Sequence, residues 1–330
     1  MSRTDENQNP IPISTVDPYD HLQIVRHPDG TITRLLQIPN TPAAPDPSNP
    51  SPVLTKDVPL NPTRNTWIRI FLPCHAMKSP TTRKLPLVVY YHGGGFIMLS
   101  ASSSINHDFC SEMAAELSAV VVSVEYRLAP ENRLPAAYDD AVEALQWIKS
   151  TDEAWLREFC DPSACFLMGT SAGGNIAYHA GLRASSAVDA HDALNIGGMI
   201  LHHPFFGGVK RTGSEVRLVN DPVLPLSSTD AMWELALPIG VDRDHGYSNP
   251  TVDDEGYEKY DRIRGLGWRV LVIGCDGDPL IDRQVELVEM LKKKGVEVVA
   301  QFHQGDYHGV ELMELSKAKE LFGLVKDFIS

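Results

Sequence analysis

The sequence ACFLMGTSAGGNIAYHAGL occupies residues 164–182 and has the pattern of a strand, a tight turn and a helix. Its first five residues are apolar, as in a short buried strand, and the alanine-containing segment 174–182 is typical of a helix. Between them, Gly169-Thr170-Ser171-Ala172-Gly173 fits the pattern G-x-S-x-G. On such a strained turn the small neighbours leave the serine hydroxyl accessible, and the helix N-terminus adds positive potential beside it. The stretch predicts that Ser171 is a nucleophile; a glycine-rich turn with a capping serine is the alternative.

A second glycine-rich motif, His92-Gly93-Gly94-Gly95-Phe96, follows the strand-like run 85–91. Three consecutive glycines usually mark a place where bare backbone must approach another group closely. A loop of this kind supplies backbone N–H donors to the oxyanion of acyl transfer, together with the residue after the nucleophile. We expect Gly93, Gly94 and Ala172 to form this oxyanion hole and His92 to brace the loop. A flexible surface loop is the alternative.

A histidine and a carboxylate are expected in the loops that follow two later strands, predicted over 268–274 and 296–302. The carboxyl ends of parallel strands are the edge on which such sheets build their sites. His308, in the second loop, is the expected general base, and His303 is the alternative closer to the strand. In the first loop, Asp278 is favoured as the acid. Asp278 lies just before Pro279, however, and an aspartate there could simply cap the following helix, so Asp276 and Asp282 remain alternatives.

The order of the predicted elements indicates one α/β catalytic domain over residues 53–330, in which strands alternate with helices around a mostly parallel central sheet. Residues 1–52 form a separate N-terminal segment, whose proline-rich part, 39–52, is expected to be an extended or mobile linker. A long insertion, about 205–265, separates a strand predicted over 196–201 from the one at 268–274. It contains a predicted helix over 227–237 and is expected to cap the active site.

The chain resembles the plant carboxylesterases of the hormone-sensitive lipase branch of the α/β-hydrolase superfamily, the group that also contains the gibberellin receptors. The resemblance covers nearly the whole chain. Besides the two glycine-rich motifs, it rests on residues 17–22 (DPYDHL), 27–34 (HPDGTITR), 56–58 (KDV), 68–73 (IRIFLP), 126–131 (YRLAPE), 135–140 (PAAYDD) and 278–282 (DPLID). It implies the α/β-hydrolase fold, a cap that the N-terminal segment shares with the insertion, and Asp278 as the triad acid. Many relatives have aspartate where this chain has Thr170, which predicts altered local hydrogen bonding and unchanged chemistry.

These residues predict a carboxylesterase that hydrolyses small carboxylic esters through a Ser171–His308–Asp278 triad and an acyl-enzyme, without a metal or organic cofactor. Adjacent His202 and His203 would point to opposite faces of a strand, which argues against a zinc site. Two other functions are considered. A hormone receptor on this scaffold would lack the catalytic histidine, which is present here; a lyase or dehydratase acting on a plant specialised metabolite could use the same groups. Candidate pocket walls, for which ordinary packing is an equal alternative, are Phe205, Phe206, Met232 and Trp233.

Composition limits the partners of the 330-residue chain. Its 29 Lys and Arg against 43 Asp and Glu give a net charge of −14, which argues against binding to nucleic acid or to an anionic membrane. No apolar run is long enough to span a bilayer, and the polar N-terminus has no signal-peptide pattern. Five widely spaced cysteines favour a reducing compartment. We therefore expect a cytoplasmic enzyme with a small-molecule ester substrate, and find no sequence signal for its oligomeric state.

Overall fold

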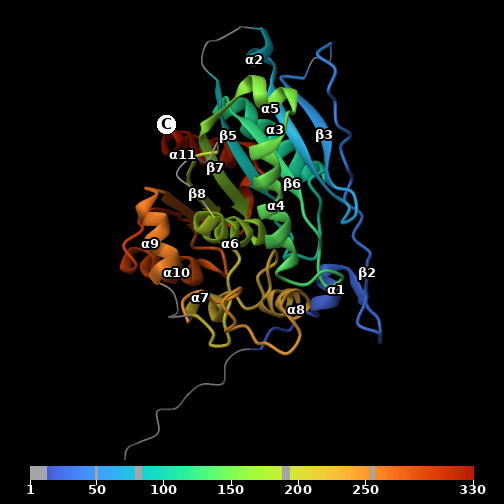
Figure 1. Ribbon diagram of the computed structural model, residues 1–330. Helices are drawn as coiled ribbons and strands as arrows, with labels where there is room; N and C mark the ends of the chain where they lie inside the picture. Colours follow the sequence, from blue (N-terminus) through green and yellow to red (C-terminus); the bar gives the residue numbers. More distant parts are fainter. Residues whose placement is uncertain (1–12, 49–50, 79–83, 188–193, 253–256) are drawn as a thin grey trace, which may run out of the picture.

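A central sheet of eight strands organises the computed structural model, which describes residues 13–48, 51–78, 84–187, 194–252 and 257–330 (Figure 1). The strand order is β10-β9-β8-β7-β5-β6-β4-β3. From β10 to β6 neighbouring strands run parallel, whereas β4 pairs antiparallel with both β6 and β3. The strands are β3 (Val53–Asn61), β4 (Thr66–Pro73), β5 (Leu85–Tyr91), β6 (Val120–Glu125), β7 (Cys160–Thr170), β8 (Ile196–His202), β9 (Arg269–Cys275) and β10 (Glu297–His303). The prediction of a mostly parallel central sheet is confirmed.

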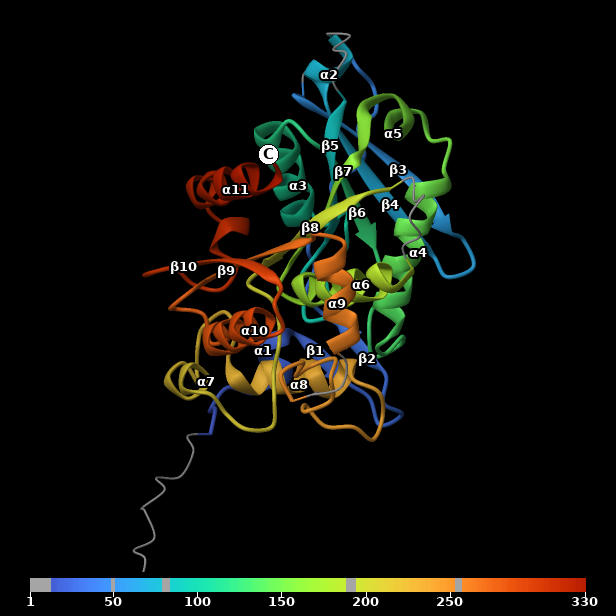
Figure 2. The same ribbon diagram turned by 60° about the vertical axis from the view of Figure 1, so that its left-hand side comes forward.

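Helices cover both faces of this sheet (Figures 1 and 2). On one face lie α3 (Ser104–Leu117) and α11 (Leu315–Ile329), and on the other lie α4 (Ala136–Ser150), α6 (Ala172–Ala187), α9 (Tyr257–Gly265) and α10 (Ile281–Lys293). In α3 the buried positions include Phe109, Cys110, Met113 and Leu117, whose helical spacing gives one apolar face toward the sheet. Short helices α2 (Cys74–Lys78), α5 (Ala154–Phe159) and η1 (Val310–Leu312) complete the catalytic domain.

Two segments that are about 200 residues apart in sequence meet at the carboxyl ends of the parallel strands (Figure 1). The N-terminal segment supplies α1 (Pro18–Leu22), β1 (Ile24–Arg26) and β2 (Ile32–Arg34), and the insertion supplies α7 (Gly213–Arg217) and α8 (Leu226–Ala236). Ser14 Oγ lies 3.1 Å from Ser227 Oγ, and Arg26 Nη1 donates to Glu234 Oε1 at 2.7 Å. α1 packs against α8, so the two segments form one layer over this end of the sheet.

The described part of the proline-rich linker is extended and fastened to the catalytic domain. Asn40 forms an isolated bridge with Ser103, and the backbone N–H of Ala44 donates to Thr55 Oγ1 at 2.8 Å. Residues 49 and 50 of the predicted linker lie outside the described residues. The predicted helix over 227–237 and the predicted strands over 196–201, 268–274 and 296–302 are present, each with ends within one residue of those expected.

Candidate active site

Ser171 occupies the sharp turn between β7 and α6, with a φ of 56° that is rare for a residue with a side chain. Gly169 and Gly173, two residues to either side, must be glycine because a side chain at either position would overlap backbone atoms. A Cβ on Gly169 would lie 2.0 Å from the carbonyl oxygen of Gly173, and a Cβ on Gly173 would lie 1.9 Å from the carbonyl oxygen of Tyr91. The pattern G-x-S-x-G thus follows directly from the packing of this turn.

The structure brings Ser171, His308 and Asp278 together from three separate loops. Ser171 Oγ lies 3.0 Å from His308 Nε2, and His308 Nδ1 lies 2.8 Å from Asp278 Oδ2. Asp278 follows β9 and His308 follows β10, so both reach the carboxyl edge of the sheet. Asp278 is completely buried, whereas Ser171 and His308 keep 9% and 8% of their surface exposed. A hydroxyl, an imidazole and a carboxylate in this order can transfer the serine proton to the imidazole.

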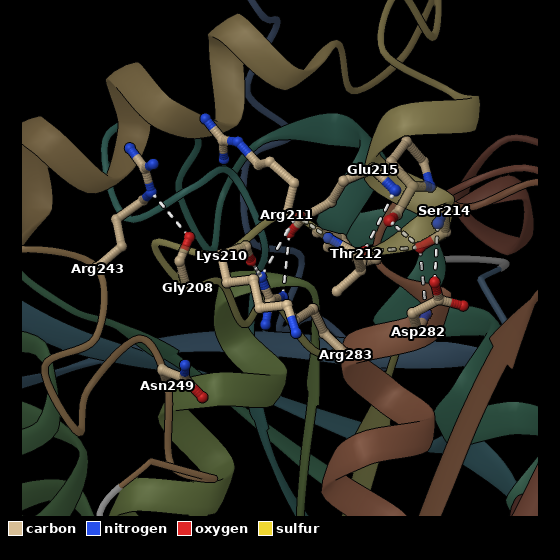
Figure 3. Close-up of polar contacts among 12 residues, drawn as sticks. Gly208, Lys210, Arg211, Thr212, Ser214, Glu215, Arg243, Asn249, Asp282 and Arg283 are labelled. Carbon is tan, nitrogen blue, oxygen red and sulfur yellow. Dashed lines mark hydrogen bonds and ion pairs between the residues drawn. The ribbon is translucent and has the colours of Figure 1, made fainter. Parts of the chain in front are cut away.

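The alternative acids and the alternative base lie elsewhere. Asp276 Oδ1 accepts from the backbone N–H of Gly305 at 2.8 Å. Asp282 Oδ2 accepts from the backbone N–H of Ser214 at 2.8 Å, which places this carboxylate against the insertion (Figure 3). His303 is the last residue of β10, and among the described residues its side chain makes no hydrogen bond to Ser171 or Asp278.

The glycine loop after β5 lies against the nucleophile turn. A Cβ on Gly93 would be 3.1 Å from the carbonyl oxygen of Thr170 and 3.3 Å from Ser171 Cβ, so a side chain here would be tightly packed against the Ser171 turn. Among the described residues, the backbone N–H groups of Gly93, Gly94 and Ala172 donate to no protein acceptor. These three predicted donors are therefore available to an oxygen that develops charge beside Ser171.

His92 lies beneath this loop and braces it. Its Nδ1 lies 2.8 Å from the carbonyl oxygen of Gly93, and its ring stacks on Tyr126 with a centroid distance of 4.3 Å. The hydroxyl of Tyr126 donates to the carbonyl oxygen of His92 at 2.8 Å. Burial lowers the pKa of His92 to about 4, so the ring is neutral near pH 7.

The Asp278 carboxylate has additional donors that the sequence analysis did not identify. Oδ2 lies 2.9 Å from His203 Nδ1 and accepts from Gln284 Nε2 at 2.8 Å, and Oδ1 accepts from the backbone N–H of Leu280 at 2.9 Å. Burial alone would raise the pKa of Asp278, but His308 and His203 lower it well below its usual range. Asp278 is therefore a fixed anion at any pH near neutrality.

The expectation that His202 and His203 point to opposite faces of a strand is wrong. β8 ends at His202, and His203 has a φ of 44°, so the alternation of strand side chains stops between them. Their ring centroids are 4.6 Å apart, and both rings face the buried carboxylate of Glu311. In the described part of the chain, two groups place three potential metal ligands close together, namely His202 with His203 and Glu311, and His203 with Asp278 and His308. In both groups hydrogen bonds or close charge contacts join these side chains to one another.

Thr170, the residue before Ser171, makes two buried contacts. Its Oγ1 accepts from the hydroxyl of Tyr90 at 2.9 Å and lies 2.9 Å from His202 Nδ1. Thr170 therefore connects β7 to the histidine pair His202 and His203.

Aromatic side chains of the insertion pack beside the glycine loop. Phe205 and Trp233 stack with a centroid distance of 4.8 Å and an interplanar angle of 3°, and Phe96 lies 5.4 Å from Trp233. Met232 contacts the loop itself, since a Cβ on Gly95 would be 2.3 Å from its Sδ. Phe206 instead packs edge-on against Tyr178 of α6, which is core packing.

A buried polar cluster fastens the insertion to the acid loop (Figure 3). Ser214 Oγ donates to the carbonyl oxygen of Pro279 at 2.7 Å, one residue from Asp278. Arg283 Nε donates to Glu215 Oε1 at 3.1 Å, and its Nη2 donates to the carbonyl oxygen of Lys210. These contacts connect α7 directly to the loop that carries Asp278.

Comparisons with known proteins identify the family of the chain and proteins of similar sequence and structure. The family described as having the α/β-hydrolase fold matches residues 88–312. Carboxylesterase 20 of Arabidopsis thaliana is 54% identical over 97% of this chain and 98% of its own length. The 3-O-acetylpapaveroxine carboxylesterase CXE2 of Papaver somniferum is 49% identical over 95% of this chain and 99% of its own length. Gibberellin receptor GID1C of Arabidopsis thaliana is 34% identical over 89% of this chain and 86% of its own length. An esterase of Pyrobaculum calidifontis has a similar structure, with a TM-score of 0.69, 27% identity, and coverage of 83% of this chain and 84% of that chain. Among the described residues, no helix has the length and apolar character needed to cross a membrane.

Proposed function

Since this chain belongs to the α/β-hydrolase fold family and is a carboxylesterase of the kind found in plants, we propose that Ser171, His308 and Asp278 are its catalytic triad. The observation that supports this assignment is the continuous hydrogen-bonded chain from Ser171 Oγ through both ring nitrogens of His308 to Asp278 Oδ2.

In the acylation half-reaction, Ser171 Oγ attacks the ester carbonyl carbon while its proton moves to His308 Nε2. The carbonyl π electrons move onto the oxygen, which accepts hydrogen bonds from the N–H groups of Gly93, Gly94 and Ala172. Loss of one such donor raises the activation free energy by about 3–4 kcal/mol. When the carbonyl re-forms, the C–O bond to the alcohol breaks, and the leaving oxygen takes the proton from His308. The product of this half-reaction is an acyl ester on Ser171.

Deacylation repeats these steps with water. His308 removes a proton from the attacking water, and the second oxyanion accepts hydrogen bonds from the same three backbone N–H groups. Collapse releases the carboxylic acid and returns the proton to Ser171. Asp278 holds His308 in the tautomer that has a free Nε2 lone pair, so the ring can accept a proton in each half-reaction.

The substrates we propose are uncharged esters with a small acyl group. The stacked rings of Phe205 and Trp233 and the contact of Met232 with Gly95 support a restricted, apolar site. The poppy relative is named for an acetyl ester, which supports a short acyl group here as well. Residues 1–52 and about 205–265 would form the cap that excludes bulk water. The five free cysteines, four of them buried, suit a cytoplasmic location.

Hydrolysis of p-nitrophenyl esters from acetate to long chains tests this function. We expect Ser171→Ala and His308→Ala to lower kcat/KM by at least about 10⁴-fold, whereas His303→Ala, the matched control, should retain activity within a few-fold. Intact-mass measurement should detect the acyl group on wild type and not on Ser171→Ala. Undiminished turnover by Ser171→Ala would overturn the triad assignment. A folded but inert wild type would instead favour elimination chemistry or hormone binding at this site.

A further inference from the structure

Two histidines share one carboxylate oxygen of Asp278. His308 Nδ1 lies 2.8 Å and His203 Nδ1 lies 2.9 Å from Asp278 Oδ2, and the two ring centroids are 5.3 Å apart. We propose that His203 is a positioning residue of this esterase: an imidazolium, held between Asp278 and Glu311, that fixes the acid and offsets part of the negative charge acting on His308. This inference rests on the proposed triad, because His203 acts only through Asp278.

The hydrogen-bond partners of His203 require a proton on both ring nitrogens. Nδ1 faces Asp278 Oδ2, and Nε2 lies 3.2 Å from Glu311 Oε2 and 3.4 Å from Oε1. An ionised carboxylate can only accept hydrogen bonds, so an imidazole between two of them must donate from both nitrogens. The ring that does so is the cation.

His202 beside it is in a different state. Since Tyr90 donates to Thr170 Oγ1, the threonine hydroxyl can donate to His202 Nδ1, which leaves His202 with one proton on Nε2, 3.0 Å from Glu311 Oε2. Burial lowers the pKa of His202. Burial also opposes charge on His203, but Asp278 and Glu311 outweigh it and raise the pKa of His203 to about 9.

The charges of the cluster are matched to the reaction. Two carboxylates and one imidazolium leave a single net negative charge in the resting site. When His308 takes the proton of Ser171, its positive charge lies between that remainder and the new oxyanion, so the net charge of the site stays at minus one while both negative charges gain a cation beside them. With His203 neutral or absent, the environment of His308 would be more negative, which favours a positive charge on that ring.

The backbone holds His203 in this position. Its φ of 44° is unfavourable for a residue with a side chain, and its backbone N–H donates to the carbonyl oxygen of Ile273 at 2.8 Å. The titratable groups around the ring are Glu311 from η1, Asp278 from the loop after β9, His202 from β8 and His308 from the loop after β10. The buried thiol of Cys275 is near both carboxylates, and burial raises its pKa, so it remains neutral.

The pH dependence of kcat/KM tests this role. We expect the acidic limb of the profile to move to higher pH by about one unit in His203→Gln, which corresponds to about tenfold lower kcat/KM on that limb. His179→Gln is the matched control, because His179 is also buried but its ring nitrogen contacts the backbone oxygen of Tyr247 and no member of the triad. An acidic limb in His203→Gln that coincides with those of wild type and the control would overturn the proposal.

The charge state of His203 can be measured without turnover by NMR of protein labelled with ¹⁵N-histidine. At pH 8 we expect one ring with both nitrogens protonated, assigned to His203 by its loss in His203→Gln. If that variant does not fold, Glu311→Gln replaces it, and the doubly protonated signal should then give way to that of a neutral ring. A neutral His203 in wild type at pH 8 overturns the proposal. Because this readout needs no ester, it separates failure of this inference from failure of the proposed triad.

Discussion

Three residues with side chains that lie at or beside the site have positive φ: Phe96 at 66°, Ser171 at 56° and His203 at 44°. Each such residue costs about 1–3 kcal/mol and persists only where the surrounding packing enforces it. The contacts that hold two of these residues can be identified. Ser171 lies between glycines that have no room for a Cβ, and His203 is bound between two carboxylates. The strained backbone is therefore found at the residues that hold the proposed site in place.

Gly173→Ala should damage both stability and activity. The added Cβ would lie 1.9 Å from the carbonyl oxygen of Tyr91, and this backbone atom belongs to a central strand that cannot move aside. We expect the free energy of unfolding to fall by at least about 2–3 kcal/mol and esterase activity to be lost. Urea denaturation and p-nitrophenyl acetate hydrolysis measure the two effects. Wild-type values for both would mean that the turn has room for a methyl group.

Gly323→Ala should have the opposite effect on stability. Gly323 lies inside α11 and is exposed, and a Cβ added to it would have no other atom within 4 Å. Alanine is favoured over glycine in a helix by about 0.5–1 kcal/mol, so the free energy of unfolding should rise by that amount. Activity should be unchanged. A fall in stability would show that α11 is not a regular helix at this position.

The sequence predicted the candidate residues that lie in local patterns, and it did not predict the contact of His203 with Asp278. Ser171 and the loop glycines belong to short motifs, and the backbone around them explains the motif. The contact of His203 with Asp278 joins residues 75 positions apart and depends on where β8 ends. Alternation along a strand predicted opposite directions for His202 and His203, and only the left-handed backbone of His203 reverses that result.

At the scale of elements, the buried ion pair of Arg283 joins α10 to α7. Arg283 is 6% exposed and Glu215 is 3% exposed, so the ion pair between them is buried. Arg283 lies near the start of α10, just after the loop that carries Asp278. The amphipathic pattern of α10 predicts the helix itself but not its pairing with α7. That pairing brings together charged side chains 68 residues apart, and hydrophobic periodicity carries no information about such partners.

Removal of this ion pair should loosen the insertion. We expect Arg283→Met to lower the free energy of unfolding by about 3–5 kcal/mol, because Glu215 would stay buried without a counter-charge. Arg157→Met is the matched control, since the Arg157–Asp152 pair is exposed and should contribute at most about 1 kcal/mol. Chemical denaturation of both variants checks the difference. Equal, small losses would indicate that Glu215 is solvated or neutral.

For the whole molecule, the sequence predicted the class of the sheet and a cap shared by the N-terminal segment and the insertion, but it did not predict the contacts that join these two segments. Alternating strands and helices imply a parallel sheet by connection rules alone. The pairing of residues 13–34 with the insertion depends on contacts such as Ser14 with Ser227, between segments that have no common sequence pattern. Because both segments cover the edge where Ser171, Asp278 and His308 meet, the topology places these three side chains beneath a layer built from distant parts of the chain.

The buried charges at this junction should make the stability of the whole protein depend on pH. His203 has a pKa raised to about 9 in the folded protein, against about 6.5 when unfolded. Its folded form therefore binds a proton that the unfolded chain releases between these values. The stabilisation is complete below about pH 6.5 and is lost as pH rises through about 9.

Urea denaturation of wild type and His203→Gln between about pH 7 and pH 10 measures this contribution. The difference in unfolding free energy should be largest at the lowest pH, decrease steadily, and level off above about pH 9. His179→Gln provides the contrast: burial lowers the pKa of His179 to about 3, so the folded ring is neutral over this range. The unfolded ring is mostly neutral there as well, and the difference for this control should stay nearly flat. A flat difference for His203→Gln as well would mean that His203 carries no extra proton in the folded protein. The two carboxylates of the cluster would then need another source of neutralisation.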